Sequence, residues 1–248
     1  MSYRTAQVAK IIGVHPNTIR FYEEMGLLPV IPRTEGGYRI FEDQHIDQLI
    51  LLRTAFRAEI ISSRLRQEVF RIVKTAAAGN LLQAYQDTQQ YLAHLKEEEA
   101  GAEDAIRITQ NLLQHIPVSE EKMLYRGRAE AAKSLGITVD VLRDWERNGL
   151  IQVPNDSNGH KSFYTKEMNR LKIIRTLRNA HYSMMAILRM LKRLDGGDCN
   201  IREAINTPEE EEDIVCAADR YITALSMAEK DALQMLELLS RMRSNQGR

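Results

Sequence analysis

Apolar side chains recur at helical spacing along most of the chain, and two stretches carry the regular spacing of a coiled-coil seam. From Leu81 to Ile116 they step by alternating fours and threes, with three polar interruptions. A second seam runs without interruption from Ile214 to Met242. The clearest seam positions are Leu92, Leu95, Ile106, Leu113, Tyr221, Leu225, Met235 and Leu239. The spacing predicts two long coiled-coil helices, over residues 80–117 and 213–243.

A different pattern precedes the first long helix. A short amphipathic segment ends at Gly13, and a second helix begins near Pro16, which suits the first helical position because the N–H it lacks would have no partner there. His15 then stands at the N-cap. In residues 30–41 a Gly-Gly pair separates short apolar–polar stretches, which predicts a small two-stranded hairpin. Helix, turn, helix and hairpin together predict a winged helix-turn-helix over residues 1–75.

The pattern returns 123 positions later. HPNTIRFYEEMGLL, residues 15–28, corresponds to TVDVLRDWERNGLI, residues 138–151. Beyond the second helix the offset falls to 122, so that Lys161 corresponds to Arg39. This internal repeat predicts a second winged helix-turn-helix over residues 123–198. The expected fold is mainly α-helical, with two winged helix-turn-helix domains, each followed by a long coiled-coil helix.

Charge is distributed unevenly, although the formal net charge is zero. Residues 1–74 contain 11 basic and 8 acidic residues, and residues 123–198 contain 14 and 8, whereas the rest of the chain contains 9 and 18. Neutralising nucleic-acid phosphates requires only a local basic surface, so this bias supports DNA binding. No stretch reaches the roughly 20 apolar residues of a membrane helix, and we expect a soluble, cytoplasmic protein.

Catalytic and metal chemistry find little support. Cys199 and Cys216 are 17 positions apart, without a C-x-x-C motif or an obvious histidine partner. The chain has no glycine-rich phosphate loop and no nucleophile elbow. We therefore expect no metal, no cofactor and no enzymatic activity.

Polar side chains gather where a winged helix-turn-helix meets DNA. The N-terminal residues of a recognition helix approach base edges and phosphates, and a wing can grip the backbone or enter the minor groove. The expected contacts are Asn17, Thr18, Arg20, Arg33, Tyr38 and Arg39 in the first region, with Arg143 and Lys161 in the second. The second wing has lost the Gly-Tyr-Arg of the first, so its contact with DNA is an open question.

The motif R-F-Y-E-x-x-G-L-L, beginning at Arg20, and the motif R-x-x-x-G-Y-R-x-F, beginning at Arg33, resemble the N-terminal domain of the MerR family of bacterial transcription regulators. The resemblance covers about the first 75 residues. It implies that Arg20 and Tyr22 lie near phosphate and that Arg39 lies on the wing, and Trp145 is the counterpart of Tyr22. Family members dimerise through a long antiparallel helix and distort promoter DNA so that RNA polymerase can use it. The implied output is activation, with repression as the alternative.

Two assemblies follow from the repeat. In one, helix 81–116 pairs with helix 214–242 of the same chain, which gives a pseudo-dimer with two non-identical readers and an asymmetric operator. In the other, the chain forms a true homodimer with four winged units. The competing function is a small-molecule or drug-binding protein derived from such a regulator, with methionines lining an apolar site between the long helices.

Overall fold

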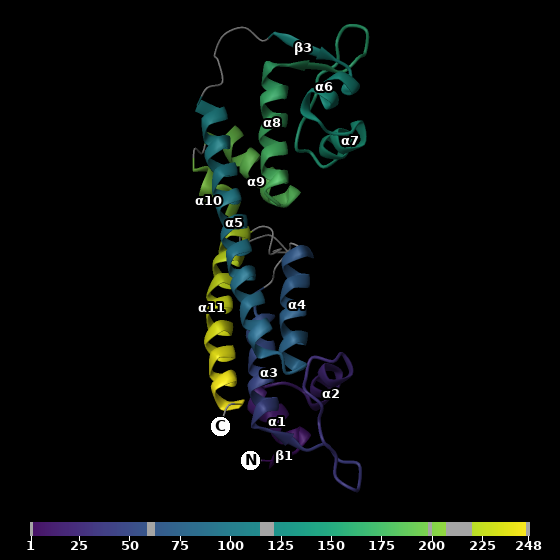
Figure 1. Cartoon of the computed structure of the whole chain (residues 1–248). Helices are drawn as coiled ribbons and strands as arrows, with labels where there is room; N and C mark the ends of the chain where they lie inside the picture. The colour runs from purple at the N-terminus through teal and green to yellow at the C-terminus, as the bar shows by residue number, and fades with distance from the viewer. Residues whose placement is uncertain (1, 59–62, 115–121, 198–199, 207–219, 247–248) are drawn as a thin grey trace. The chain divides into compact units, whose positions relative to one another are not determined.

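The computed structural model describes residues 2–58, 63–114, 122–197, 200–206 and 220–246. Regular structure is almost entirely helical, which confirms the predicted mainly α-helical fold (Figure 1). The chain forms two compact units, residues 1–97 with 224–248 and residues 98–223. Each unit contains one winged region. The long helix α5 (Leu81–Gln114) contributes its first half to one unit and its second half to the other.

The first unit contains the N-terminal winged region and most of the C-terminal helix. Besides α5, its elements are β1 (Ser2–Tyr3), α1 (Thr5–Ile12), α2 (Pro16–Glu24), β2 (Phe41–Glu42), α3 (Asp43–Ala55), α4 (Ser63–Ala77) and α11 (Tyr221–Gln246). Four apolar side chains at the centre of the winged region are 0% exposed, namely Val8, Ile19, Phe41 and Leu49. They bring α1, α2, β2 and α3 together around one core.

The winged region of the second unit has the same order of elements as that of the first, and α10 follows it. Besides α5, the elements of this unit are β3 (Met123–Arg126), α6 (Arg128–Leu135), α7 (Val139–Arg147), β4 (Ser162–Tyr164), α8 (Thr165–Asn179), α9 (Met184–Asp195) and α10 (Ile201–Asn206). Four apolar side chains are again 0% exposed, namely Ala131, Leu142, Phe163 and Leu171. Each lies 123 or 122 positions after one of the four core residues of the first unit. The two winged regions therefore share element order and core positions.

The sharp turns also match. Gly13 (φ 73°) and Gly136 (φ 65°) adopt the left-handed conformation after the first helix of each region, where a side chain would strain the backbone. The following N–H donates back to the carbonyl of Ala9 at 2.9 Å in the first region and of Ala132 at 3.1 Å in the second. This turn separates the first helix of each region from the second.

The hairpin predicted over residues 30–41 is only partly correct. A single antiparallel bridge joins Arg33 and Arg39, whereas Phe41 pairs with Tyr3 of β1. Phe41 is fully buried, so its strand lies against the helical core and takes the N-terminal segment as its partner. The second region repeats this arrangement with its own bridge and the β3–β4 sheet. A two-residue strand carries no alternation that the sequence could reveal.

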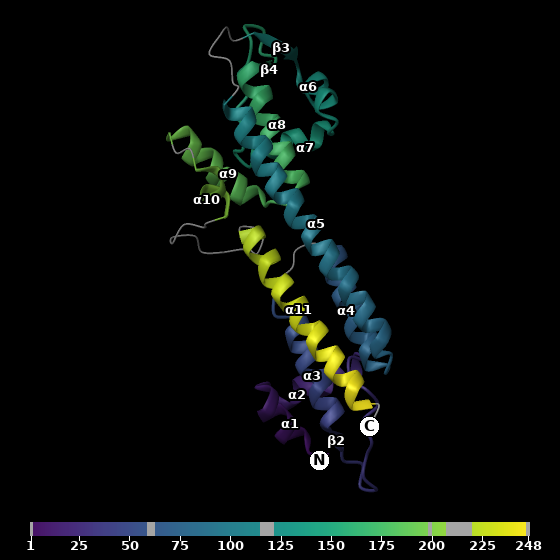
Figure 2. The ribbon, with the colours of Figure 1, turned by 60° about the vertical axis from the view of Figure 1, so that its left-hand side comes forward.

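Within the first unit, α11 runs antiparallel to the first half of α5 (Figures 1 and 2). Lys96 Nζ lies 3.6 Å from Glu229 Oε1, and the guanidinium of Arg243 lies 5.9 Å from the centre of the Tyr85 ring. The earlier residue of α5 contacts the later residue of α11, as expected for two antiparallel helices.

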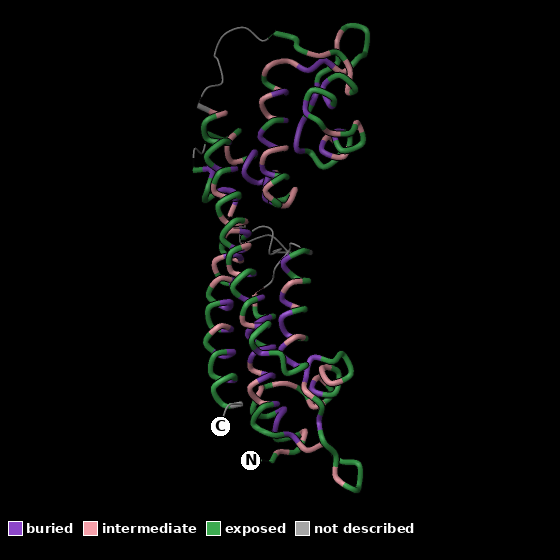
Figure 3. Tube along the Cα trace, in the orientation of Figure 1, coloured by how far each residue is buried: buried purple, intermediate pink, exposed green. Residues whose placement is uncertain are grey.

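Buried positions recur along both long helices (Figure 3). Among the predicted seam residues, those at most 3% exposed are Leu95, Ile106, Tyr221, Leu225, Met235 and Leu239, while Leu92 and Leu113 are intermediate. Two of the polar interruptions, Thr88 and Thr109, are buried and donate to carbonyls four residues earlier at 2.7 Å. Residues 213–219 of the second predicted helix lie outside the described residues. No helix in the described ranges is long and apolar enough to span a membrane.

Helix α11 also contacts the winged region of the first unit. Arg57, just after α3, donates through Nε to Asp231 at 2.9 Å and through Nη2 to Gln234 at 2.6 Å. Arg241 donates to Asp47 of α3 at 3.1 Å. The C-terminal helix thus packs in the first unit, although it follows the second winged region in sequence.

Candidate nucleic-acid interface

Helix α2 has a polar outer face opposite a buried one. Ile19 is fully buried, Asn17 and Arg20 are exposed, and Thr18 is intermediate. His15 caps the helix, because its Nδ1 accepts the N–H of Asn17 at 3.2 Å. The amide oxygen of Asn17 accepts from Arg20 Nη1 at 3.2 Å. The cap and the burial pattern together hold three polar side chains at the N-terminal end of α2, where a recognition helix meets DNA.

Glu23 connects α2 to the wing. Its Oε1 accepts from Arg33 Nη2 at 3.2 Å, and its Oε2 accepts from Arg39 Nε at 2.5 Å. The two arginines come from opposite sides of the bridged wing, so one carboxylate holds both sides against the recognition helix. The side chain of Arg33 remains 49% exposed, whereas that of Arg39 is 22% exposed. The guanidinium of Arg33 is therefore the more accessible of the two, and Arg39 mainly positions the wing.

Aromatic and basic side chains meet at the outer part of the first wing. Tyr38 is 68% exposed, and the guanidinium of Arg4 lies 5.6 Å from the centre of its ring. Tyr22 is intermediate in exposure and packs against the core. Sequence reasoning missed Arg4 because it precedes the repeated motif, and missed the role of Glu23, although the repeat marks that position.

The second recognition helix, α7, carries a carboxylate beside each of its arginines. Arg143 Nη1 lies 2.8 Å from Asp140 Oδ1, and Arg147 Nη2 lies 3.0 Å from Asp144 Oδ1. Such exposed pairs contribute little to stability, but they offset positive charge that would face phosphate. The counterpart of Asp140 in α2 is the neutral Asn17. The two helices therefore present different charges at the same position.

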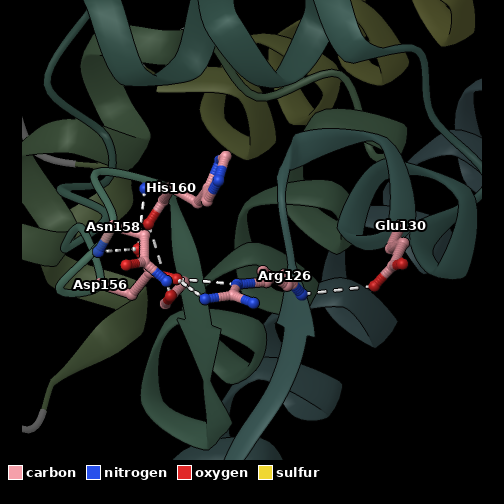
Figure 4. A network of polar contacts seen from close by, with 6 residues as sticks. Arg126, Glu130, Asp156, Asn158 and His160 are labelled. Atoms are coloured by element: carbon pink, nitrogen blue, oxygen red, sulfur yellow. Dashed lines mark hydrogen bonds and ion pairs between the residues drawn. The ribbon is translucent and has the colours of Figure 1, made fainter.

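The second wing, around the Asn155–Lys161 bridge, is hydrogen-bonded to β3. Asp156 accepts from Arg126 Nε at 2.7 Å and from the backbone N–H groups of Asn158 and His160, each at 2.9 Å (Figure 4). The hydrogen bond from Arg126, followed by that from the His160 backbone, lowers the pKa of the Asp156 carboxyl below its ordinary value. The backbone N–H of Arg126 also donates to Glu130 at 3.3 Å. This wing is therefore held through the strand β3.

Glu146, the counterpart of Glu23, has a different partner. Arg128 of α6 donates to both of its carboxylate oxygens at 2.8 Å, and this hydrogen bonding raises the pKa of Arg128. The carboxylate therefore ties α6 to α7. Lys161, the counterpart of Arg39, donates to the carbonyl of Val153 at 2.6 Å.

Two expected contacts of the second region lie differently in the structure. Trp145 is 5% exposed and belongs to the core, so the expectation that it faces phosphate is wrong. The alignment of Trp145 with Tyr22 does not predict an outward side chain, because Tyr22 itself packs against the core. Lys161 is intermediate in exposure, and its ammonium group is engaged by a carbonyl of its own wing. Arg143 is exposed at the surface of α7.

Metal chemistry has no site in the part of the chain that the structure describes. There, no three histidine, cysteine, aspartate or glutamate side chains gather in a group that could hold an ion. Cys199 and Cys216 both lie outside the described residues.

Comparison with known proteins identifies relatives of both winged regions. Residues 4–41 match the family model of the MerR family regulatory protein, and residues 129–194 match that of the MerR HTH family regulatory protein. The HTH-type transcriptional regulator CueR of Escherichia coli O6:H1 is 37% identical over 91 residues, which cover 37% of this chain and 58% of that protein. The mercuric resistance operon regulatory protein of Bacillus cereus is 42% identical over 53 residues, 21% of this chain and 40% of that protein. The chain thus spans less than two thirds of the length of these curated relatives, and no solved structure matches it.

Proposed function

We propose that this chain, whose two winged regions are both of the MerR type, is a sequence-specific regulator that binds double-stranded promoter DNA. The observation that carries the proposal is the geometry of α2 and its wing. A capped helix exposes Asn17 and Arg20, and Glu23 holds an arginine-bearing wing beside it. Helix N-termini, arginines and amide side chains are the groups that proteins use on phosphates and base edges.

Each exposed residue has a distinct role in this proposal. Arg20 and Arg33 neutralise phosphates, which fixes the position of the protein on the duplex without reading sequence. Asn17 and Thr18 face base edges, and an asparagine can pair with adenine through two hydrogen bonds. Tyr38, at the outer part of the wing, contacts the sugar–phosphate backbone.

The two readers differ in sequence, so we expect an asymmetric operator. Asn17 and Thr18 of α2 are replaced by Asp140 and Val141 in α7. An aspartate accepts a hydrogen bond from cytosine N4 and cannot donate one, whereas a valine side chain offers only apolar contact, for example to a thymine methyl group. Arg143 is the phosphate contact proposed for α7, and its ion pair with Asp140 weakens that contact.

One chain supplies both readers in this proposal. Helix α11 lies along α5 in the same molecule, which is the position that a second chain would take in a dimer built on antiparallel helices. Covalent linkage makes this pairing independent of protein concentration. We infer that the repeat arose by duplication of one winged region with its long helix. A homodimer with four winged units is the competing assembly.

The proposed output is control of transcription by distortion of the promoter, with RNA polymerase as the second partner and the bacterial cytoplasm as the place of action. The curated relatives are named as regulators, which favours regulation over simple sequestration of a small molecule.

Selection from random double-stranded DNA with the full chain tests the proposal, followed by footprinting of the enriched sequence. We expect one asymmetric footprint and an affinity that falls steeply with salt. The Arg20→Ala variant should bind all sequences more weakly, with a salt slope smaller by about 1. Failure to enrich any sequence, or unchanged affinity of Arg20→Ala, would overturn the proposal.

A further inference from the structure

A pocket of about 690 Å³ opens beside the recognition helix of the first unit. Its walls come from α2, the second half of α3 and α4, and they include Phe21, Met25, Phe56 and Phe70. The rings of Phe56 and Phe70 meet edge to face, with centroids 6.4 Å apart and planes at 64°. This volume suits a drug-sized molecule, and the lining is mostly apolar.

The fold does not require the apolar side chains that are exposed at this pocket. Phe21 is 53% exposed, Met25 is 40% exposed and Phe56 is 41% exposed, which is costly for a protein in water. The second winged region has the same elements and core, and it carries polar residues at the corresponding positions. The counterparts of Phe21, Met25, Ile50, Phe56 and Phe70 are Asp144, Asn148, Lys172, Arg178 and Lys192. The apolar wall is therefore specific to the first region.

The two regions also differ in whether the arginine at this position, Arg53 or Arg175, has a hydrogen-bond partner. Arg175 of the second region donates through Nη1 to the carbonyl of Leu135 at 2.6 Å, which ties α8 to α6. Its counterpart Arg53 lines the pocket and is exposed, and within the described residues it has no hydrogen bond or ion pair. The neighbouring Arg57 is occupied by α11. Arg53 is thus the cation that can meet a ligand here.

We propose that this pocket binds a flat, apolar organic anion, such as an aromatic carboxylate. The ring system would lie among the aromatic side chains, and the acid group would pair with the Arg53 guanidinium, whose fork matches a carboxylate. Among the described residues, no aspartate or glutamate lines the pocket, so none of them offers an organic cation a counter-charge there. Because Phe21 and Tyr22 belong to α2, the ligand would contact the recognition helix about one turn after its N-terminal reading residues. The site does not depend on the proposed DNA binding.

Isothermal titration calorimetry of the full chain with 2-naphthoate tests the site, with 2-naphthylmethylammonium as the charge-reversed probe. We expect saturable binding of naphthoate at one site per chain and none of the cation over the same concentration range. Arg53→Gln should weaken naphthoate binding at least tenfold, and Phe21→Asp, which installs the residue of the second region, should abolish it. Arg66→Gln, which removes an exposed cation of α4 away from the pocket, should bind as the parent chain does.

Circular dichroism melting of each variant confirms that the fold is retained before binding is compared. Absence of saturable naphthoate binding, equal binding of the cation, or unchanged binding by Arg53→Gln would each overturn the proposal. DNA binding is measured separately, so its failure would leave this result standing.

Discussion

Arg39 Nε donates to Glu23 Oε2 at 2.5 Å, so the first wing is joined directly to the recognition helix that it flanks. In the second region the corresponding carboxylate, Glu146, accepts instead from Arg128 of α6. The same acidic position therefore fixes a wing in one region and a helix pair in the other. If the first region binds DNA as proposed, this contact would keep its wing in place beside the recognition helix.

The Glu23→Gln variant distinguishes two roles of this side chain: holding the wing in position and adding a negative charge near the DNA. Removing a negative charge near DNA should strengthen binding if charge alone mattered. We expect the opposite, a loss of about three- to tenfold in affinity, because the wing is released from α2. Amide hydrogen exchange at Gly37 should accelerate in parallel. The matched control is Glu24→Gln, which removes the same charge from an exposed position of the same helix. Tighter binding by Glu23→Gln, or equal behaviour of both variants, would contradict the positioning role.

Asp140 limits the contribution of the second recognition helix. Its carboxylate lies 2.8 Å from Arg143, so Asp140→Asn should leave that arginine for phosphate, raise DNA affinity and steepen the salt slope by about 1. Asp104→Asn is the control, because Asp104 pairs with Arg107 at 3.0 Å with the same spacing, on α5. Fluorescence anisotropy over a range of salt concentrations measures both. If Asp140→Asn binds no more tightly than Asp104→Asn, α7 does not reach the duplex.

Sequence patterns predicted the long helices and the winged regions because both depend on periodic burial. Leu95 and Met235 lie in the core as the seam requires, and Ile19 lies on the buried face of α2. Glycine positions also predicted the turns correctly, since Gly13 and Gly136 both adopt the left-handed conformation.

Contacts between distant side chains left no such pattern. The Glu23–Arg39 pair spans 16 positions, and the Asp156–Arg126 pair spans 30. Nothing in spacing alone says which of several arginines a carboxylate will meet. Trp145 was misplaced for a related reason, because a match between aligned residues does not state whether the side chain points outward.

The second wing should loosen at low pH. The pKa of Asp156 is lowered by Arg126, so its carboxylate stabilises the wing above about pH 4, and that contribution is lost as the pH falls through the lowered pKa. Backbone amide resonances of Asn158 and His160 report the transition in NMR spectra. We expect its midpoint below the ordinary value for aspartate. Arg126→Gln should move the midpoint upward. A midpoint in the parent chain at or above the ordinary value would show that the Arg126 contact does not persist in solution.

The C-terminal helix should stabilise the first unit. Met235 of α11 is 0% exposed, and Met235→Ala should lower the free energy of unfolding by about 2–5 kcal/mol. Hydrogen exchange should accelerate in α3 and α4 more than in α8 and α9. Leu233→Ala, at a position 48% exposed on the same helix, should change stability by about 0.5 kcal/mol or less. Equal effects of the two substitutions would place α11 outside that core.

Sedimentation equilibrium of the full chain, free and bound to its selected DNA, tests most directly whether one chain supplies both readers. The single-chain arrangement predicts a free species of 28.5 kDa at all concentrations and one chain per DNA duplex. A two-chain species that persists on dilution without DNA, or two chains on each duplex, would contradict it.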